Sequence, residues 1–138
     1  MKFEQPEVLK IEKVSKVYGV GNIEVRAVDS VDLVAKSGEI VLIMGPSGSG
    51  KTTLITMAGA LLKPTTGEIY IDGENIVTMS EKSRINIRRH KIGFIFQAFN
   101  LLSNLSALEN VLVPLGIVGV KRNIARKKSG NPEIIAFN

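Results

Sequence analysis

The sequence predicts an α/β fold in which a parallel sheet follows an antiparallel β subdomain at the N-terminal end. Three observations predict it. Extended segments occupy residues 8–36, a short strand that is apolar on both faces follows at residues 40–44, and a helical stripe of apolar residues begins at Lys51. A buried strand, a glycine-rich loop and a helix in this order are typical of layered α/β proteins.

The length and composition limit what the chain can be. A length of 138 residues allows one domain or part of one, and 44% hydrophobic with 22% charged residues is typical of a globular protein. The sequence has no Cys and a single His, which excludes disulfides, thiolate metal sites and His-rich clusters. Any metal must therefore be bound through oxygen. We expect an intracellular, soluble chain, since the first residues lack an apolar signal core.

The net charge of +5 is concentrated near the C-terminal end. Residues 1–120 carry 13 basic and 12 acidic residues, whereas residues 121–138 carry 5 basic and 1 acidic. A short basic segment of this kind is typically a solvated helix face or a loose end. We therefore expect no nucleic-acid partner.

The first half of the chain contains clear turn and helix signals. The turn signal at residues 19–22 separates two extended segments and predicts an antiparallel pair. The apolar stripe through Leu54 and Ala58 predicts a helix from Lys51 to Leu62, which must end before Pro64.

The second half is predicted from shorter signals. Asp72-Gly73 predicts a hairpin, and Ser80 predicts the cap of a basic helix that reaches about His90. Residues 92–96 predict another strand, which ends at Gln97. The capping-box spacing of Ser106 and Glu109 predicts a helix that begins at Ser106 and extends to Pro114 or slightly beyond.

The chemistry centres on residues 45–52, Gly-Pro-Ser-Gly-Ser-Gly-Lys-Thr, which fit the phosphate-loop pattern. The pattern requires a buried strand before it and a helix after it, and residues 40–44 and the stripe after Lys51 are predicted to supply both. The glycines let backbone N–H groups converge on phosphate oxygens, and the helix N-terminus adds partial positive charge. Lys51 supplies an ammonium group and Thr52 a hydroxyl for Mg²⁺. We therefore predict a P-loop NTPase core.

Several segments together resemble the nucleotide-binding domain of ABC transporters; they are residues 45–53, 64–69 and 92–97. Residues 96–102, 107–111 and 114–115 are most similar to the lipoprotein-release and macrolide-export branch of that family. The resemblance covers about residues 6–128. It implies an ATPase subunit that uses ATP and Mg²⁺ and couples ATP binding and hydrolysis to transport. It also implies a transmembrane permease partner, a second ATP-binding subunit and a place on the cytoplasmic face of the membrane.

The resemblance implies roles for individual residues. Tyr18 would stack on adenine, an interaction worth about 1–3 kcal/mol, and its alternative is packing at a strand end. Gln97 would reach Mg²⁺ and the attacking water, so Gln97 and Lys51 are the candidate catalytic residues and Thr52 and Gln97 the candidate metal ligands. Residues 99–105 resemble the surface that docks the permease, and their alternative is packing in the core. The residues implied to line the phosphates are Gly45, Ser47, Gly48, Ser49, Gly50, Lys51, Thr52 and Thr53.

Three motifs of the family do not occur in the sequence: a Leu-Ser-Gly-Gly-Gln signature, a Walker B strand that ends in Asp-Glu, and a switch histidine after Gln97. Residues 131–135 resemble the lead-in to Walker B, but no carboxylates follow them. We therefore expect residues 1–128 to be the N-terminal part of an ABC-type ATP-binding domain, truncated at its C-terminal end, and residues 129–138 to be a divergent tail.

Two functions stay open at this point. The chain is either the ATP-binding subunit of an ABC transporter or a non-hydrolysing nucleotide-binding fragment. Because the missing carboxylates hold Mg²⁺ and polarise water, we expect nucleotide binding at reduced affinity and hydrolysis at background. We also expect self-association or a loose fold, since a buried strand without its neighbour exposes an edge. GTPases and small-molecule kinases are disfavoured, because the sequence has no Asn-Lys-x-Asp pattern or kinase-like lid.

Overall fold

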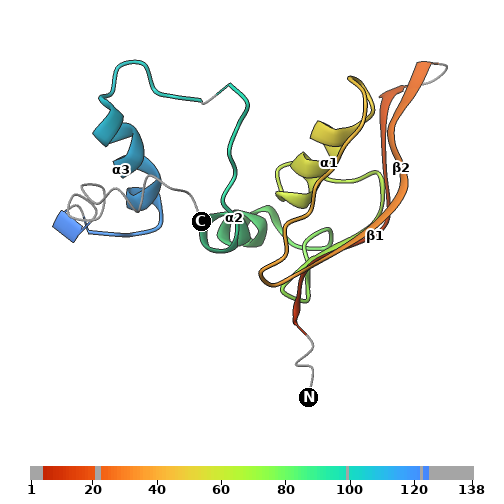
Figure 1. The fold of residues 1–138 in the computed structure, drawn as a ribbon, viewed down its shortest axis with the longest axis horizontal. Coiled ribbons are helices and arrows are strands. Elements are labelled where there is room, and N and C mark those ends of the chain that lie inside the picture. Colours follow the sequence, from red (N-terminus) through yellow and green to blue (C-terminus); the bar gives the residue numbers. More distant parts are fainter. Residues whose placement is uncertain (1–4, 21–22, 99, 122, 125–138) are drawn as a thin grey trace. The chain divides into compact units, whose positions relative to one another are not determined.

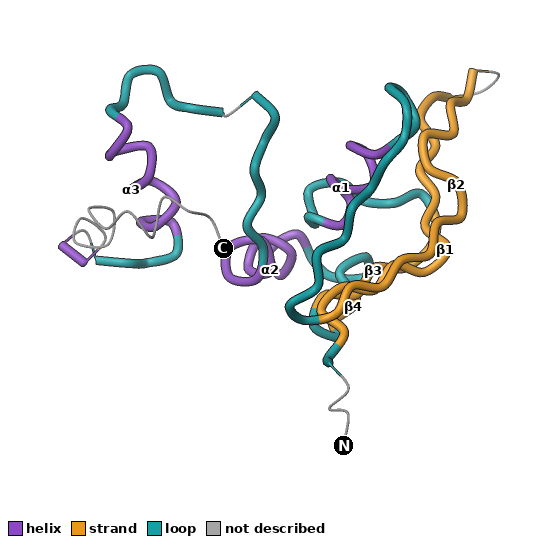
Figure 2. Tube along the Cα trace, in the orientation of Figure 1, coloured by secondary structure: helices purple, strands orange, loops and turns teal. Residues whose placement is uncertain are grey.

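A four-stranded antiparallel sheet dominates the first of the two compact units into which the chain divides, Met1–Ile92 and Gly93–Asn138. The computed structural model describes residues 5–20, 23–98, 100–121 and 123–124. Figure 1 shows the long strands β1 and β2 side by side, and Figure 2 labels all four strands of the sheet, whose order is β2-β1-β3-β4. Its strands are β1 (Glu7–Val20), β2 (Ile23–Lys36), β3 (Thr66–Ile71) and β4 (Glu74–Asn75).

The predicted antiparallel opening and the second hairpin are both confirmed. β1 and β2 form one long hairpin that places Tyr18 opposite Val25. β3 and β4 join through Asp72 and Gly73, whose φ angles of 47° and 80° are those of a tight turn with left-handed backbone. β1 also pairs with β3, so the first strand lies inside the sheet.

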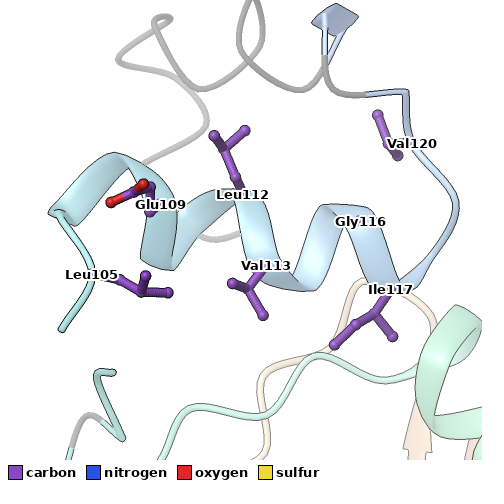
Figure 3. Close-up of a pocket in the computed structure, with 7 residues that line it drawn as sticks. All are labelled: Leu105, Glu109, Leu112, Val113, Gly116, Ile117 and Val120. Atoms are coloured by element: carbon purple, nitrogen blue, oxygen red, sulfur yellow. The ribbon is translucent and has the colours of Figure 1, made fainter. Parts of the chain in front are cut away.

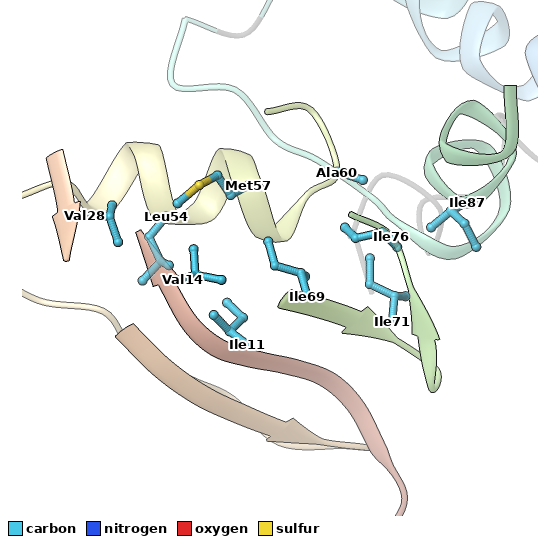
Figure 4. Packing of buried hydrophobic residues seen from close by; sticks show 10 residues of the cluster. All are labelled: Ile11, Val14, Val28, Leu54, Met57, Ala60, Ile69, Ile71, Ile76 and Ile87. Atoms are coloured by element: carbon cyan, nitrogen blue, oxygen red, sulfur yellow. The ribbon is translucent and has the colours of Figure 1, made fainter. Parts of the chain in front are cut away.

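The core of this unit lies between the sheet and helix α1 (Lys51–Ala58). Figure 4 shows Leu54 and Met57 of α1 facing the side chains of β1 and β3. Met57, Val14 and Ile69 are fully buried, and burying such a side chain contributes roughly 1.5–3 kcal/mol. The buried apolar residues are Ile11, Val14, Val28, Leu54, Met57, Ala60, Ile69, Ile71, Ile76 and Ile87.

Helix α1 is shorter than its apolar stripe predicts, and it ends at Ala58 rather than Leu62. Gly59 terminates the helix, and Ala60 adopts a φ of 56°, which is incompatible with a continued right-handed helix. Arg88 donates a hydrogen bond to the Ala60 carbonyl oxygen at 2.8 Å. Arg88 therefore holds this turn in addition to the hydrogen bonds that Leu61 and Leu62 N–H donate to the Thr56 carbonyl oxygen.

The two other predicted helices are confirmed with their caps. In α2 (Glu81–Lys91) the Ser80 hydroxyl accepts a hydrogen bond from Ser83 N–H at 3.2 Å. His90 is exposed near its basic end. In α3 (Ala107–Ile117) Ser106 and Glu109 form the predicted capping box, and the helix continues past Pro114.

The prediction of a buried parallel strand at residues 40–44 is wrong. These residues belong to the stretch drawn as loop between β2 and α1 in Figure 2, and no strand of the described residues pairs with them. Ile40 is 95% exposed, Leu42 75% and Met44 79%. A parallel strand requires neighbours on both sides, and residues 92–96, predicted as another strand, are also in a loop. The predicted parallel sheet is thus not formed within the described residues.

Two further observations complete the fold. The predicted boundary between residues 128 and 129 lies outside the described residues. None of the helices in the described ranges combines the length and the apolar character that crossing a membrane requires.

Candidate functional site

Two left-handed glycines shape the turn in the loop between residues 44 and 51. Gly48 and Gly50 adopt φ angles of 81° and 86°, in the left-handed region that glycine tolerates. Ser49 N–H donates to the Pro46 carbonyl oxygen at 3.3 Å, which closes the turn. The loop is exposed over most of its length, so a ligand can reach its backbone.

The position of Gly50 is fixed by strand β2. A Cβ atom at Gly50 would lie 2.0 Å from the Ala27 carbonyl oxygen and 3.4 Å from the Val28 side chain. Only a residue without a side chain fits such an approach. The end of the loop is therefore seated against the β1–β2 hairpin.

Lys51 folds back over the loop. Its Nζ donates to the carbonyl oxygens of Gly45 and Pro46, each at 2.7 Å, and lies 3.4 Å from the Ser49 hydroxyl. Lys51 is also the only charged residue between Glu39 and Lys63. The loop thus carries one positive charge, with no carboxylate from the same stretch to neutralise it.

The start of α1 presents free donors next to that charge. Gly50 caps the helix without a side-chain hydrogen bond, and the first turn contains no acidic residue. The first bond of the helix is Leu54 N–H to Gly50 O at 2.9 Å, and the amides of the three residues before Leu54 have no acceptor among the described residues. Unpaired amides and the helix dipole, equivalent to about half a positive charge, favour an anion here.

Thr52 is exposed at this helix start, and its hydroxyl has no hydrogen-bond partner within the described ranges. A free hydroxyl oxygen suits Mg²⁺, which prefers oxygen ligands and keeps several waters. The described residues contain no group of three or more acidic or imidazole side chains that could hold a metal. The role of Thr52 in metal binding stays a prediction.

Tyr18 lies near the end of β1 and is 43% exposed. Its neighbour in register is Val25, while Val17 pairs with Arg26 and Lys16 with Val28. Ala27, the contact of Gly50, lies between Arg26 and Val28 on the same strand. The end of the phosphate loop and Tyr18 therefore lie at neighbouring positions of one hairpin.

Lys16, which is not among the residues predicted from the sequence, lies beside Tyr18. The Lys16 ammonium is 5.4 Å from the centroid of the Tyr18 ring and donates to the Lys63 carbonyl oxygen at 2.8 Å. The signal that could have found it is the spacing of two residues, because positions i and i+2 of a strand share one face.

Gln97 belongs to the second unit, where it is exposed in the loop before α3. Its roles in catalysis and metal binding stay predictions. Of the predicted docking segment 99–105, Phe99 lies outside the described residues, and Leu101 and Leu102 are 68% and 51% exposed.

The second unit contains an apolar pocket of about 490 Å³ along α3. Figure 3 shows its lining residues on α3 and the turns that flank the helix. None of them is among the predicted ATP-site residues. They are Leu105, Glu109, Leu112, Val113, Gly116, Ile117 and Val120.

Comparison with known proteins identifies the family. The family model described as ABC transporter matches residues 28–136. The chain is 46% identical over 112 residues to an uncharacterized ABC transporter ATP-binding protein of Mycobacterium tuberculosis, covering 81% of this chain. It is 41% identical over 124 residues, or 90% of this chain, to the macrolide export ATP-binding/permease protein MacB of Hyphomonas neptunium. The chain therefore belongs to the ABC transporter family, as an ATP-binding domain of the MacB-like branch.

A solved structure confirms the fold. The ATP-binding cassette MJ0796 of Methanocaldococcus jannaschii, in a dimeric post-hydrolysis state bound to ADP and Pi, matches with a TM-score of 0.82 and 44% identity over 88% of this chain. The backbone thus follows the ABC cassette fold even though residues 40–44 are unpaired. The chain spans 53% of that structure's chain, 34% of the Mycobacterium tuberculosis relative and 19% of MacB.

Proposed function

We propose that this chain is the nucleotide-binding part of an ABC transporter ATP-binding subunit and that residues 45–53 bind the triphosphate of Mg-ATP. One observation carries the proposal: the Lys51 ammonium is held 2.7 Å from the carbonyl oxygens of Gly45 and Pro46, next to the uncapped start of α1. A lysine ammonium and unpaired amides at a helix N-terminus are the elements that bind phosphate oxygens. The ADP and Pi bound to MJ0796 support the same ligand class for this chain.

The base would stack on Tyr18. The exposed ring and its place on the hairpin that seats Gly50 support this role. Stacking on an aromatic ring contributes about 1–3 kcal/mol, so Tyr18 adjusts the affinity while the phosphate loop supplies the main attraction.

Hydrolysis requires more than these groups. Phosphoryl transfer depends on positioning and on charges that hold Mg²⁺ and orient water. Thr52 would offer one ligand to Mg²⁺ and Gln97 a second, and the sequence contributes no Asp-Glu pair after Gln97. We propose that this chain by itself binds nucleotide without turning it over, and that a whole subunit couples hydrolysis to transport.

The proposed partners are a second ATP-binding subunit and a membrane permease, which would hold the chain at the cytoplasmic face. MJ0796 is described as dimeric, and MacB as an ATP-binding/permease protein. The apolar pocket on α3 and the exposed Leu101 and Leu102 support permease docking by the second unit, since exposed apolar surface of this kind marks interaction sites.

Calorimetry with Mg-ATP tests the phosphate site. We expect binding by the chain and a loss of at least about tenfold in Lys51→Ala, since a charged hydrogen-bond donor to phosphate contributes about 1.5–3 kcal/mol. Lys82→Ala, on the exposed surface of α2, is the matched control and should bind as the unchanged chain does. Folded protein that releases no heat with Mg-ATP would refute the proposal.

Phosphate release separates the two functions. Background release, unchanged in Lys51→Ala, supports a non-hydrolysing nucleotide-binding part. Turnover that Lys51→Ala abolishes would show that this chain is an ATPase by itself.

A further inference from the structure

The Lys16 side chain makes two contacts that bring together distant parts of the chain. Its ammonium donates to the Lys63 carbonyl oxygen at 2.8 Å, in the loop that follows α1. The same ammonium lies 5.4 Å from the centroid of the Tyr18 ring, within the range of a cation–π interaction. A cation held by a carbonyl against one side of a ring leaves the other side as the free stacking surface.

Further hydrogen bonds tie the same strand to the same loop. Thr65 N–H donates to the Ser15 carbonyl oxygen at 2.9 Å, and the Thr65 hydroxyl accepts from Val17 N–H at 3.0 Å. Ser15 is buried, and its hydroxyl accepts from Ser30 N–H at 2.8 Å. Hydrogen bonds therefore hold the backbone on both sides of Lys16, and this fixes the position from which its side chain extends to Tyr18.

These contacts of β1 with Lys63 and Thr65 also connect the two ends of the proposed nucleotide site. The loop that contains Lys63 and Thr65 follows α1, and the N-terminus of α1 carries Lys51 and the free amides. At the other end, Gly50 is seated on Ala27 of the hairpin. The hairpin that carries Tyr18 therefore contacts the chain on both sides of α1: β2 contacts Gly50 before the helix, and β1 contacts Lys63 and Thr65 after it.

We propose that Lys16 is a positioning residue for the nucleotide base and acts through Tyr18. This inference rests on the proposed function. Lys16 fixes the ring and closes one of its faces, so that a base stacks on the opposite face while its phosphates lie at the loop. Removing the ammonium loosens the ring and weakens binding of a nucleotide, and it leaves binding of a ligand without a base unchanged.

The chain offers a matched control. Lys10, on the same strand, places its ammonium 5.9 Å from the centroid of the Tyr70 ring and pairs with Glu12 at 2.7 Å. Lys10 and Tyr70 thus form a second lysine–tyrosine pair of similar geometry. None of the described interactions of Lys10 is with the loop after α1. Lys10→Met removes an equivalent cation–π contact and an equivalent charge from the same sheet.

The experiment compares the dissociation constants of Mg-ATP and of magnesium tripolyphosphate, which has the phosphates alone. We expect Lys16→Met to weaken Mg-ATP binding about two- to fivefold, the range of an exposed cation–π contact, and to leave tripolyphosphate binding unchanged. Lys16→Arg should restore Mg-ATP binding, and Lys10→Met should change neither constant. Because Lys16 acts through the Tyr18 ring, Lys16→Met should not weaken Mg-ATP binding further in a chain that already carries Tyr18→Leu.

Each other outcome overturns the inference. Equal weakening of both ligands would make Lys16 a structural residue, and an additive effect in the Tyr18→Leu background would make it independent of the ring. Unchanged Mg-ATP binding in Lys16→Met would remove its role while the proposed function stands. If the unchanged chain binds neither ligand, the proposed function fails as well. If it binds tripolyphosphate as tightly as Mg-ATP, the base contributes nothing to binding, and only the phosphate site of the proposed function stands.

Discussion

The side-chain amide of Asn110 pairs with the backbone of Leu102 as a neighbouring strand would. Leu102 N–H donates to Asn110 Oδ1 at 2.8 Å, and Asn110 Nδ2 donates to the Leu102 carbonyl oxygen at 3.2 Å. The same Nδ2 lies 3.1 Å from the Leu105 carbonyl oxygen and 3.0 Å from that of Ser106. One side chain of α3 therefore holds part of the loop that is predicted from the sequence to be a docking surface.

Replacing this amide should loosen the loop without unfolding the chain. In Asn110→Asp the donor is lost and a carboxylate oxygen faces three carbonyl oxygens, so we expect the Leu102 amide to exchange its hydrogen at least about tenfold faster, as the loss of about 1.4 kcal/mol would cause. Asn104→Asp, in the same exposed loop, is the control. Unchanged protection of Leu102 would mean that the loop is held by other contacts.

Gly50 should be the least replaceable glycine of the phosphate loop. Gly50→Ala meets the Ala27 carbonyl oxygen at 2.0 Å and also requires a left-handed φ of 86°. We expect a loss of about 2–5 kcal/mol in unfolding free energy, from backbone strain of about 1–2 kcal/mol plus overpacking of about 1–3 kcal/mol.

Gly48→Ala separates the two costs. Gly48 has a φ of 81° and no atom within 4 Å of its Cβ position, so only backbone strain applies. Urea denaturation of both variants measures the difference, and equal losses would contradict the contact with Ala27.

The start of α2 should respond to acid through Glu81. Hydrogen bonds from Arg84 and then from Arg88 hold the pKa of Glu81 below its ordinary value of 4.5. A lowered pKa in the folded chain means that the stabilisation is complete above the unfolded value and is lost as the pH falls through the folded one. We expect Glu81→Gln to lower the melting temperature at pH 7, and the difference from the unchanged chain to shrink below about pH 4.5.

Glu24→Gln, at the exposed end of the β1–β2 hairpin, is the control for this series of melting curves. A Glu81→Gln difference that stays constant from pH 7 to pH 3 would show that the two arginine contacts contribute nothing.

Residues 40–44 should drive self-association. Ile40, Leu42 and Met44 are exposed in a segment whose backbone pairs with no described strand, and residues 40–50 contain no charge to oppose pairing. We expect sedimentation velocity to show concentration-dependent oligomers, and Leu42→Glu to shift them towards monomer. Val25→Glu, at an exposed but paired position of β2, should leave the distribution unchanged. A sharply melting monomer at all concentrations would contradict this expectation.

The elements that could be predicted from the sequence are those decided by a few adjacent residues. The Asp72-Gly73 turn, the Ser80 cap and the capping box of Ser106 with Glu109 each depend on contacts within four positions, and all are present. The segment at residues 40–44 could not be predicted in the same way. Its pairing as a strand depends on neighbours from distant parts of a sheet, whatever its own apolar pattern.

The candidate site also has features that depend on adjacent residues, which could be predicted, and features that depend on distant contacts, which could not. The turn at Gly48 and Gly50 and the placement of Lys51 follow from a local pattern of glycines and a lysine. The contact of Lys16 with Lys63 joins residues 47 positions apart, and its partner is a backbone carbonyl that any residue type could supply. No residue pattern indicates such a contact before the chain is folded.

The strand order β2-β1-β3-β4 determines when the sheet can be completed during synthesis. β1 is made first and its partner β2 directly after it, but the other edge of β1 has no partner until β3 at residues 66–71 is made. The phosphate loop and α1 are made in that interval, before the second ladder exists. β3 therefore pairs with β1 only after the phosphate loop and α1 have been made, and a pause in translation before residue 66 would leave one edge of β1 unpaired.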